Sequence, residues 1–126
     1  MSTPISCPCG SGKPYADCCG PCHAGKPAAT AEALMRSRYS AYVLALESYL
    51  LGTWHPTTRP VSLDLAPAPK WLGLSVKRHE TLGTDNAVVE FVARYKVGGR
   101  AHRLHESSRF RREDGCWYYV DGEFPA

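Results

Sequence analysis

The stretch Cys7-Pro8-Cys9-Gly10-Ser11-Gly12-Lys13-Pro14-Tyr15-Ala16-Asp17-Cys18-Cys19 decides how the start of this 126-residue chain folds. Its C-x-C and C-C pairs are eight residues apart and can bring four thiolates onto one tetrahedral ion, for which zinc is the best match. The segment has few large apolar side chains, so the metal would be its core and metal binding would coincide with folding. Gly10, Gly12 and Gly20 are expected to adopt positive φ where the backbone turns between ligands.

Disulfides are the first alternative, because the chain has six cysteines. The sequence shows no charged segment followed by an apolar one, as a secretory signal would have, and no apolar run long enough to span a membrane. We therefore expect a cytoplasmic protein, in which thiols stay reduced and metal binding is favoured over disulfides. Bridges within Cys7–Cys9 or within Cys18–Cys19 would also be strained.

Thiol redox chemistry is the second alternative. Cys19-Gly20-Pro21-Cys22 has the C-x-x-C spacing of thiol oxidoreductases, whose reactive thiolate needs a lowered pKa at a helix N-terminus after a buried strand. Residues 10–17 are too rich in glycine and polar side chains to form that strand. A thiol redox protein using Cys19 and Cys22 is therefore kept as an alternative that ranks behind metal binding.

Residues 7–19 resemble the SEC-C motif, the small zinc-binding segment known from the translocase ATPase SecA. Cys22 and His23 lie outside the motif and are kept as possible substitute ligands. The resemblance implies four zinc ligands: Cys7, Cys9, Cys18 and Cys19.

The resemblance continues beyond the cysteines. The stretches LMRSRYSAY (34–42), TWHP (53–56), SRF (108–110) and WYYVDG (117–122) together are similar to the YchJ family of bacterial proteins. This resemblance implies a SEC-C motif followed by a nuclear-transport-factor-2-like domain, and it implies no established activity. We expect two parts, a zinc knuckle in residues 1–28 and an α+β domain in residues 29–126. Because the segment 24–29 carries few large apolar groups, the two parts are expected to share little core.

The residue pattern after the cysteines independently indicates an α+β fold. Residues 30–52 are predicted to form one helix that begins at the N-cap Thr30 and ends at Gly52. Prolines predict a loop over 53–69. The turn pairs Gly98-Gly99 and Asp114-Gly115 then predict an antiparallel meander. The helix is predicted to bury Met35, Tyr39, Tyr42, Leu46 and Tyr49, and the strands show alternation at Leu72, Leu74 and Val76 and from Val89 to Val97.

The two turns also fix a strand register, and the register assigns faces. The register places Glu106, Ser108, Asp121 and His102 on the sheet face that meets the helix, because strand side chains alternate. Two carboxylates there, Glu106 and Asp121, could act as a proton donor and a base with separated pKa values. We favour structural hydrogen bonds for both over catalysis. The predicted pairs are Phe91 with Glu106, Ala93 with Leu104, Tyr95 with His102, Phe110 with Tyr119, and Ser108 with Asp121.

The leading functional hypothesis is a non-catalytic module. Its zinc knuckle would dock to a protein partner through Lys13, Pro14 and Tyr15, and its α+β domain would hold a small ligand. The alternative is a small-molecule enzyme, isomerase- or hydrolase-like, that uses Glu106 and Asp121; whether the protein is an enzyme is left open, leaning towards no. Further residues expected at the pocket are Arg38, Trp54, His55, His102 and Ser108.

Nucleic acid is a further class of partner to consider. The net charge is +3 and the isoelectric point is about 8.6, which is only mildly basic. Arg109, Arg111 and Arg112 cluster, but Glu113 and Asp114 follow at once. This pattern favours a solvated face of mixed charge, with salt-sensitive phosphate binding as the alternative.

Overall fold

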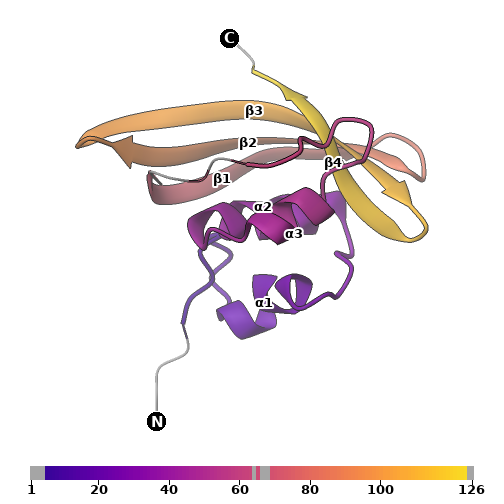
Figure 1. The fold of residues 1–126 in the computed structure, drawn as a ribbon, viewed down its shortest axis with the longest axis horizontal. Coiled ribbons are helices and arrows are strands. Elements are labelled where there is room, and N and C mark those ends of the chain that lie inside the picture. Colours follow the sequence, from indigo (N-terminus) through magenta and orange to yellow (C-terminus); the bar gives the residue numbers. More distant parts are fainter. Residues whose placement is uncertain (1–4, 64, 66–68, 125–126) are drawn as a thin grey trace.

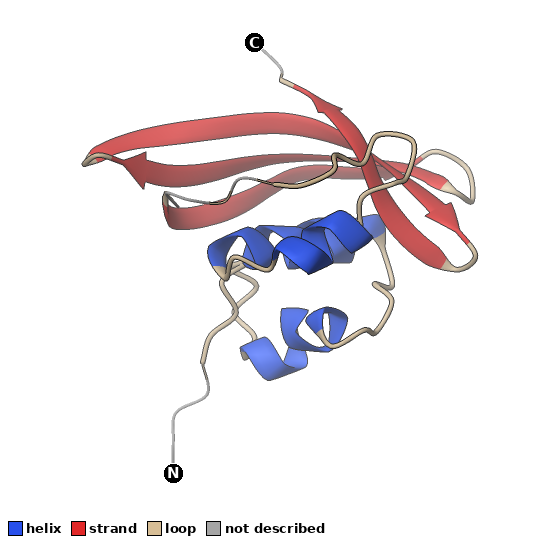
Figure 2. Cartoon of the chain, in the orientation of Figure 1, coloured by secondary structure: helices blue, strands red, loops and turns tan. Residues whose placement is uncertain are grey.

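The computed structural model describes residues 5–63, 65 and 69–124. It has three layers: an antiparallel sheet, a pair of helices against one face of it, and the cysteine-rich segment on the far side of those helices (Figures 1 and 2). This arrangement confirms the α+β class. Within the described residues, no helix combines the length and the apolar character needed to cross a membrane. The elements are η1 (Tyr15–Asp17), α1 (Cys19–His23), α2 (Ala31–Val43), α3 (Glu47–Gly52), β1 (Lys70–Thr81), β2 (Asn86–Val97), β3 (Arg100–Glu113) and β4 (Cys116–Glu123).

The predicted single helix over residues 30–52 is wrong, because the chain forms two helices there. The start is as predicted: the Thr30 hydroxyl accepts a hydrogen bond from the Ala33 N–H at 3.0 Å. The first helix ends in a Schellman motif, in which the Leu46 N–H donates to the Ala41 carbonyl at 2.8 Å and Ala45 takes a left-handed φ of 57°. Glycine usually occupies that position, so an alanine gave no signal that the helix would end.

The sheet is the predicted meander, with strand order β1-β2-β3-β4. The β2–β3 register is also as predicted, pairing Phe91 with Glu106 and Tyr95 with His102. Gly98 and Gly99 both have positive φ in the connecting turn, which is the conformation of a type I′ hairpin. The register between the two central strands therefore followed from the turn residues alone.

The predicted pairing of Ser108 with Asp121 is wrong. Phe110 does pair with Tyr119, but a bulge follows on β4, so Asp121 lies opposite Arg109 and Gly122 lies opposite Ser108. One extra residue moves every later side chain to the other face of the strand. Asp121 consequently leaves the face that meets the helices.

A similar irregularity corrects the prediction for β1. The register shifts between Trp71 and Gly73, so Trp71 packs against the core while Leu72 is 46% exposed. Leu74 and Val76, as predicted, pack against the core.

The expectation that the two parts share little core is wrong. One hydrophobic cluster runs from the buried cysteines through helix α2 to the inner face of the sheet. The knuckle is therefore packed onto the domain rather than tethered to it. Members of the cluster are Cys7, Cys9, Cys19, Ala31, Leu34, Met35, Tyr39, Ala87, Val89, Ala93, Phe110 and Trp117.

The substitution Ala45→Gly should stabilise the protein. A left-handed conformation costs a non-glycine residue about 1–2 kcal/mol, and the greater freedom of glycine in the unfolded chain offsets about 0.4–1 kcal/mol of the gain. We expect an increase of about 0.5–1 kcal/mol in the free energy of unfolding, measured by urea denaturation followed by circular dichroism. The control Ala33→Gly, at an ordinary helical position of α2, should lower it by about 1 kcal/mol. Equal effects of the two variants would contradict this explanation of the helix end.

Candidate functional site: a cysteine cluster and an aromatic cavity

Four cysteine sulfurs converge next to helix α2. The Sγ atoms of Cys7, Cys9, Cys18 and Cys19 all lie within 4.8 Å of one another. Two of the separations are 3.6 Å, between Cys9 and Cys18, and 4.0 Å, between Cys18 and Cys19. A tetrahedral zinc site with bonds of about 2.3 Å has edges of about 3.8 Å. The four sulfurs are thus spaced as ligands of one metal ion.

Local backbone geometry explains why this sequence forms the cluster. The Cys7 N–H donates to the Lys13 carbonyl at 3.0 Å, which closes a small turn between the two cysteine pairs. Gly10 and Gly12 have φ of 77° and 84°, as predicted. The expectation of positive φ for Gly20 is wrong, because Gly20 lies in helix α1. A glycine is needed there because a Cβ would lie 2.8 Å from the carbonyl oxygen of Tyr15.

Hydroxyl groups surround the sulfurs. The hydroxyl of Ser40, fully buried on α2, lies 3.3 Å from Cys19 Sγ and 3.6 Å from Cys7 Sγ. The hydroxyl of Ser11 lies 3.1 Å from Cys18 Sγ. Hydrogen bonds, above all from Cys19, lower the pKa of the Cys9 thiol to about 4, while burial raises the pKa of Cys18 and the hydrogen bond to Cys9 raises the pKa of Cys19. The donors therefore favour a thiolate at Cys9, which is the form that binds metals.

Cys22 and His23, the predicted substitute ligands, lie outside the cluster. The His23 ring instead links the knuckle to α2: its Nε2 donates to the Ser37 carbonyl at 2.8 Å, and its Nδ1 accepts from the Tyr15 hydroxyl at 2.6 Å. Both ring nitrogens are thereby engaged in hydrogen bonds within the protein.

The geometry also bears on the thiol redox alternative. Cys19 belongs to the sulfur cluster, while burial raises the pKa of the Cys22 thiol. A 3-10 turn, η1, precedes the C-x-x-C segment in place of a strand. Redox exchange is helped by a low pKa at the attacking thiol, the first cysteine of a C-x-x-C segment, and the hydrogen bond to Cys9 raises the pKa of Cys19 instead.

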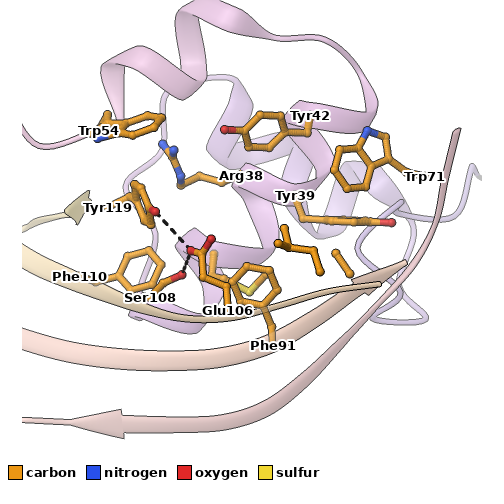
Figure 3. A pocket seen from close by; sticks show the side chains of 13 residues that line it. Arg38, Tyr39, Tyr42, Trp54, Trp71, Phe91, Glu106, Ser108, Phe110 and Tyr119 are labelled. Atoms are coloured by element: carbon orange, nitrogen blue, oxygen red, sulfur yellow. Dashed lines mark hydrogen bonds between the residues drawn. The ribbon is translucent and has the colours of Figure 1, made fainter. Parts of the chain in front are cut away.

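A cavity of about 280 Å³ lies between α2 and the inner face of the sheet (Figure 3). One end is apolar, formed by aromatic and aliphatic side chains, and the other end carries Arg38, Tyr42, Glu106, Ser108 and Tyr119. Concave apolar sites with a few converging polar groups are the usual form of small-ligand sites. The remaining lining residues are Met35, Tyr39, Trp54, Trp71, Phe91, Ala93, Leu104 and Phe110.

Arg38 is held rigidly at the polar end, where it is 5% exposed. Its guanidinium carbon lies 5.1 Å from the ring centre of Trp54 and 4.7 Å from that of Tyr119. Its Nη1 donates to the Leu50 carbonyl at 2.8 Å and to the Thr53 hydroxyl at 2.7 Å. Burial lowers the pKa of the guanidinium, but arginine starts so high that it stays charged.

The segment after α3 fixes Trp54 in this position. The Tyr119 N–H donates to the Thr53 carbonyl at 2.8 Å, and the His55 N–H donates to the Tyr119 carbonyl at 2.7 Å. Residues 53–55 therefore pair in parallel with β4 and bring the Trp54 ring against that of Tyr119.

Glu106 is the carboxylate of the cavity, and it is 9% exposed. Its Oε2 accepts hydrogen bonds from the Ser108 hydroxyl and, at 3.2 Å, from the Tyr119 hydroxyl. Gly122 of β4 makes room for it, because a Cβ at Gly122 would lie 2.6 Å from the carboxyl carbon. The carboxylate thus occupies space that a side chain from β4 would otherwise fill. Burial raises the pKa of the Tyr119 phenol, and the nearby Glu106 charge adds to that shift.

The structure does not bring Asp121 together with Glu106. Because of the β4 bulge, Asp121 faces outward and accepts bidentate hydrogen bonds from Arg109, which lower the pKa of the carboxyl group. The predicted pair of carboxylates is therefore corrected to a single carboxylate in the cavity.

Two predicted pocket histidines also lie elsewhere. Nδ1 of the buried His55 accepts from the Thr57 N–H at 3.2 Å, so its Nε2 donates to Glu113 at 3.0 Å and lowers the pKa of that carboxyl. His102 is exposed and stacks on Tyr95 at 5.2 Å. Arg38, Trp54, Glu106 and Ser108 do line the cavity. Tyr42 and Tyr119 were not predicted from the sequence as pocket residues. Tyr42 lies one helical turn after Arg38, and this spacing could have indicated that both side chains reach the same cavity.

The clustered arginines of β3 are paired with acids. Arg109 contacts Asp121, Arg111 contacts Glu113 at 3.2 Å, and Arg112 contacts Asp85 at 3.4 Å. This pattern fits a solvated face of mixed charge better than a phosphate-binding surface.

Residues 30–122 match the family model described as YchJ, middle NTF2-like domain, and residues 6–21 match the SEC-C motif. The chain belongs to the YchJ family. UPF0225 proteins of Ralstonia nicotianae and Chromobacterium violaceum are 60% and 61% identical to it, over 94% and 93% of this chain and 90% and 91% of those proteins.

Solved structures of similar proteins agree with the fold. A SEC-C motif containing protein from Rhodopseudomonas palustris matches with a TM-score of 0.86 and 39% identity, covering 97% of this chain and all of that one. Another, from Psychrobacter arcticus, matches with a TM-score of 0.79 and 33% identity, covering 95% of this chain and 82% of that one. These two proteins thus share the fold described above over most of this chain.

The substitution Gly122→Ala should displace the Glu106 carboxylate. Overpacking of this kind costs about 1–3 kcal/mol, and we expect the free energy of unfolding to fall by that amount in urea denaturation. Gly73→Ala is the matched control, since nothing lies within 4 Å of a Cβ added there, and it should leave stability unchanged or raise it by up to about 1 kcal/mol. If Gly122→Ala is as stable as the control, the carboxylate does not rest against Gly122.

Proposed function

We propose that this YchJ-family chain is a non-catalytic binding protein, in which a zinc ion fastens the knuckle to helix α2 and the cavity beneath α2 takes a small ligand. The observation that carries the proposal is the cavity itself. Its walls are largely aromatic, and its two charged groups are already positioned: Arg38 donates to Leu50 and Thr53, and Glu106 accepts from two hydroxyls. Preformed sites of this kind bind with little reorganisation.

Zinc is proposed because the donor set suits it. Four thiolates at tetrahedral spacing are the ligands of closed structural zinc sites, and they leave no open position for a substrate. Three of the four cysteines are buried, and Ser40 of α2 supports two of the sulfurs. Partners outside the ligand set often contribute to metal affinity, so the metal would hold α2 as well as the knuckle.

The protein should contain one zinc ion per chain, bound by the sulfur cluster. Elemental analysis of reduced, purified protein should show that Cys18→Ser loses most of the metal, because a closed site needs all four ligands. Cys22→Ser is the matched control: it changes the same residue type four positions along and should retain full zinc. Loss of zinc from Cys22→Ser but not from Cys18→Ser would contradict the ligand set.

Binding is favoured over catalysis by the number of acid–base groups at the site. A pair of carboxylates with separated pKa values is a common basis for acid–base catalysis, and Asp121 lies on the other face of the sheet. Glu106 accepts from Ser108 and Tyr119, so these hydroxyls fix it in place. The predicted isomerase- or hydrolase-like chemistry that uses both carboxylates loses its geometric basis.

Docking of the knuckle to a protein partner stays a prediction. It is supported by the exposure of Lys13 and Asp17 between the cysteine pairs, on a segment whose cysteines pack towards α2. Tyr15 is less available, because its hydroxyl donates to His23.

Ligand binding can be tested by filling the cavity. Small aromatic compounds should shift amide resonances of β2 and β3 residues that line the cavity, in ¹H–¹⁵N correlation spectra of the full chain. Ala93→Leu, which extends a lining side chain into the space, should remove this binding while the spectrum stays that of a folded protein. Ala101→Leu, at an exposed position of β3, should bind as the wild type does. Undiminished binding by Ala93→Leu would contradict the cavity as the site.

A further inference from the structure

The cavity presents different chemistry at its two ends. Tyr39, Trp71 and Phe91 line the apolar end, and Glu106 and Arg38 face each other across the polar end (Figure 3). The ring centres of Tyr39 and Trp71 are 5.6 Å apart and the ring planes are tilted by 77°, and both rings border the cavity. Aromatic side chains prefer stacked or edge-to-face contacts with other rings. A molecule that fills the site therefore needs a flat apolar body and one polar edge.

The polar end offers a hydrogen-bond acceptor. Both protein donors to Glu106, Ser108 and Tyr119, reach the same oxygen, Oε2. Among the described residues none donates to Oε1, and this oxygen points into the cavity (Figure 3). Oε1 stays accessible from the cavity, where a carboxylate oxygen can accept further hydrogen bonds. An N–H or O–H group of a ligand would form a charge-assisted hydrogen bond with it.

The charge balance of the cavity selects against a charged ligand. Arg38 contributes one positive charge and Glu106 one negative charge. Arg38 is committed to the protein, since Nη1 donates to Leu50 and Thr53 and its faces contact aromatic rings. An anionic ligand would lie beside Glu106 and a cationic one beside Arg38, and in either case one excess charge would be buried. An uncharged ligand leaves the balance intact.

We propose that the cavity binds a small uncharged aromatic or heteroaromatic molecule whose N–H or O–H edge donates to Oε1 of Glu106. Its ring lies among Tyr39, Trp71 and Phe91. The volume of about 280 Å³ is at the small end of ligand sites, which limits the guest to one or two fused rings. This inference rests on the proposed function and adds the chemical class of the ligand.

Five probes test the class, each titrated into the full-length wild-type protein at pH 7 and followed by amide chemical shifts. Indole and benzofuran share a shape, but only indole has an N–H donor. Benzamide, benzoate and benzamidinium share a shape but are neutral, anionic and cationic. We expect indole to bind at least about tenfold tighter than benzofuran, because a hydrogen bond to a charged acceptor contributes that much or more. Benzamide should bind tighter than both charged analogues.

Two variants connect the preference to Glu106. Glu106→Gln keeps the shape and removes the charge, so the advantage of indole over benzofuran should fall to below about threefold. Gly122→Ala, which moves the carboxylate without changing it, should reduce the advantage likewise, and Gly73→Ala should leave it unchanged. If a variant does not fold, the relative affinities of the five probes for the wild-type protein still test the proposed ligand class.

The outcomes separate the ligand class from ligand binding itself. Equal binding of indole and benzofuran, or tighter binding of benzoate or benzamidinium, overturns the proposed class and leaves the cavity a ligand site. An unchanged indole advantage in a folded Glu106→Gln variant overturns the role of Glu106. If none of the five probes binds, the proposed ligand class is wrong. The proposed function is also wrong only if no other small aromatic compound shifts the cavity amides in the cavity-filling experiment.

Discussion

Helix α2 is packed on two sides at once, and the rest of the structure depends on that double contact. On one side the small side chains of Ser37 and Ser40 are fully buried, which allows the knuckle to approach closely enough for His23 to reach the helix backbone and for Ser40 to reach two sulfurs. On the other side Arg38 and Tyr39 form part of the cavity. Larger residues on the first side would separate the knuckle from the domain.

This arrangement gives the cysteine cluster contacts beyond the knuckle. A short segment without a core of its own depends on its metal, and here the buried cysteines belong to the same hydrophobic cluster as the inner face of the sheet. The helix that lines the cavity is also the helix that covers the sulfurs. One helix, α2, therefore contacts both the cysteine cluster and the cavity.

Buried charge at the cavity is a cost that stability alone does not explain. Apolar side chains in place of a buried Arg and Glu are often at least as stabilising, yet here both groups are kept and each is satisfied separately by the protein. Arg38 draws on a helix end and two aromatic rings, and Glu106 draws on hydroxyls of β3 and β4. Such separately held charges are typical of sites that bind a ligand.

The sequence by itself determined the features that depend on local chemistry. The cysteine spacing indicated the sulfur cluster, Thr30 the start of α2, and Gly98-Gly99 the register of the central strands, because each depends on residues close together in the chain. Only the tertiary structure decided the helix end at Ala45, the inward face of Trp71 and the outward face of Asp121. A left-handed alanine and an inserted strand residue carry no composition signal, since their cost is offset by packing with distant residues. The single-residue bulge in β4 accounts for the largest difference between the predicted and the observed cavity. It turns the Asp121 carboxylate away from the cavity and places Gly122 where Glu106 needs room.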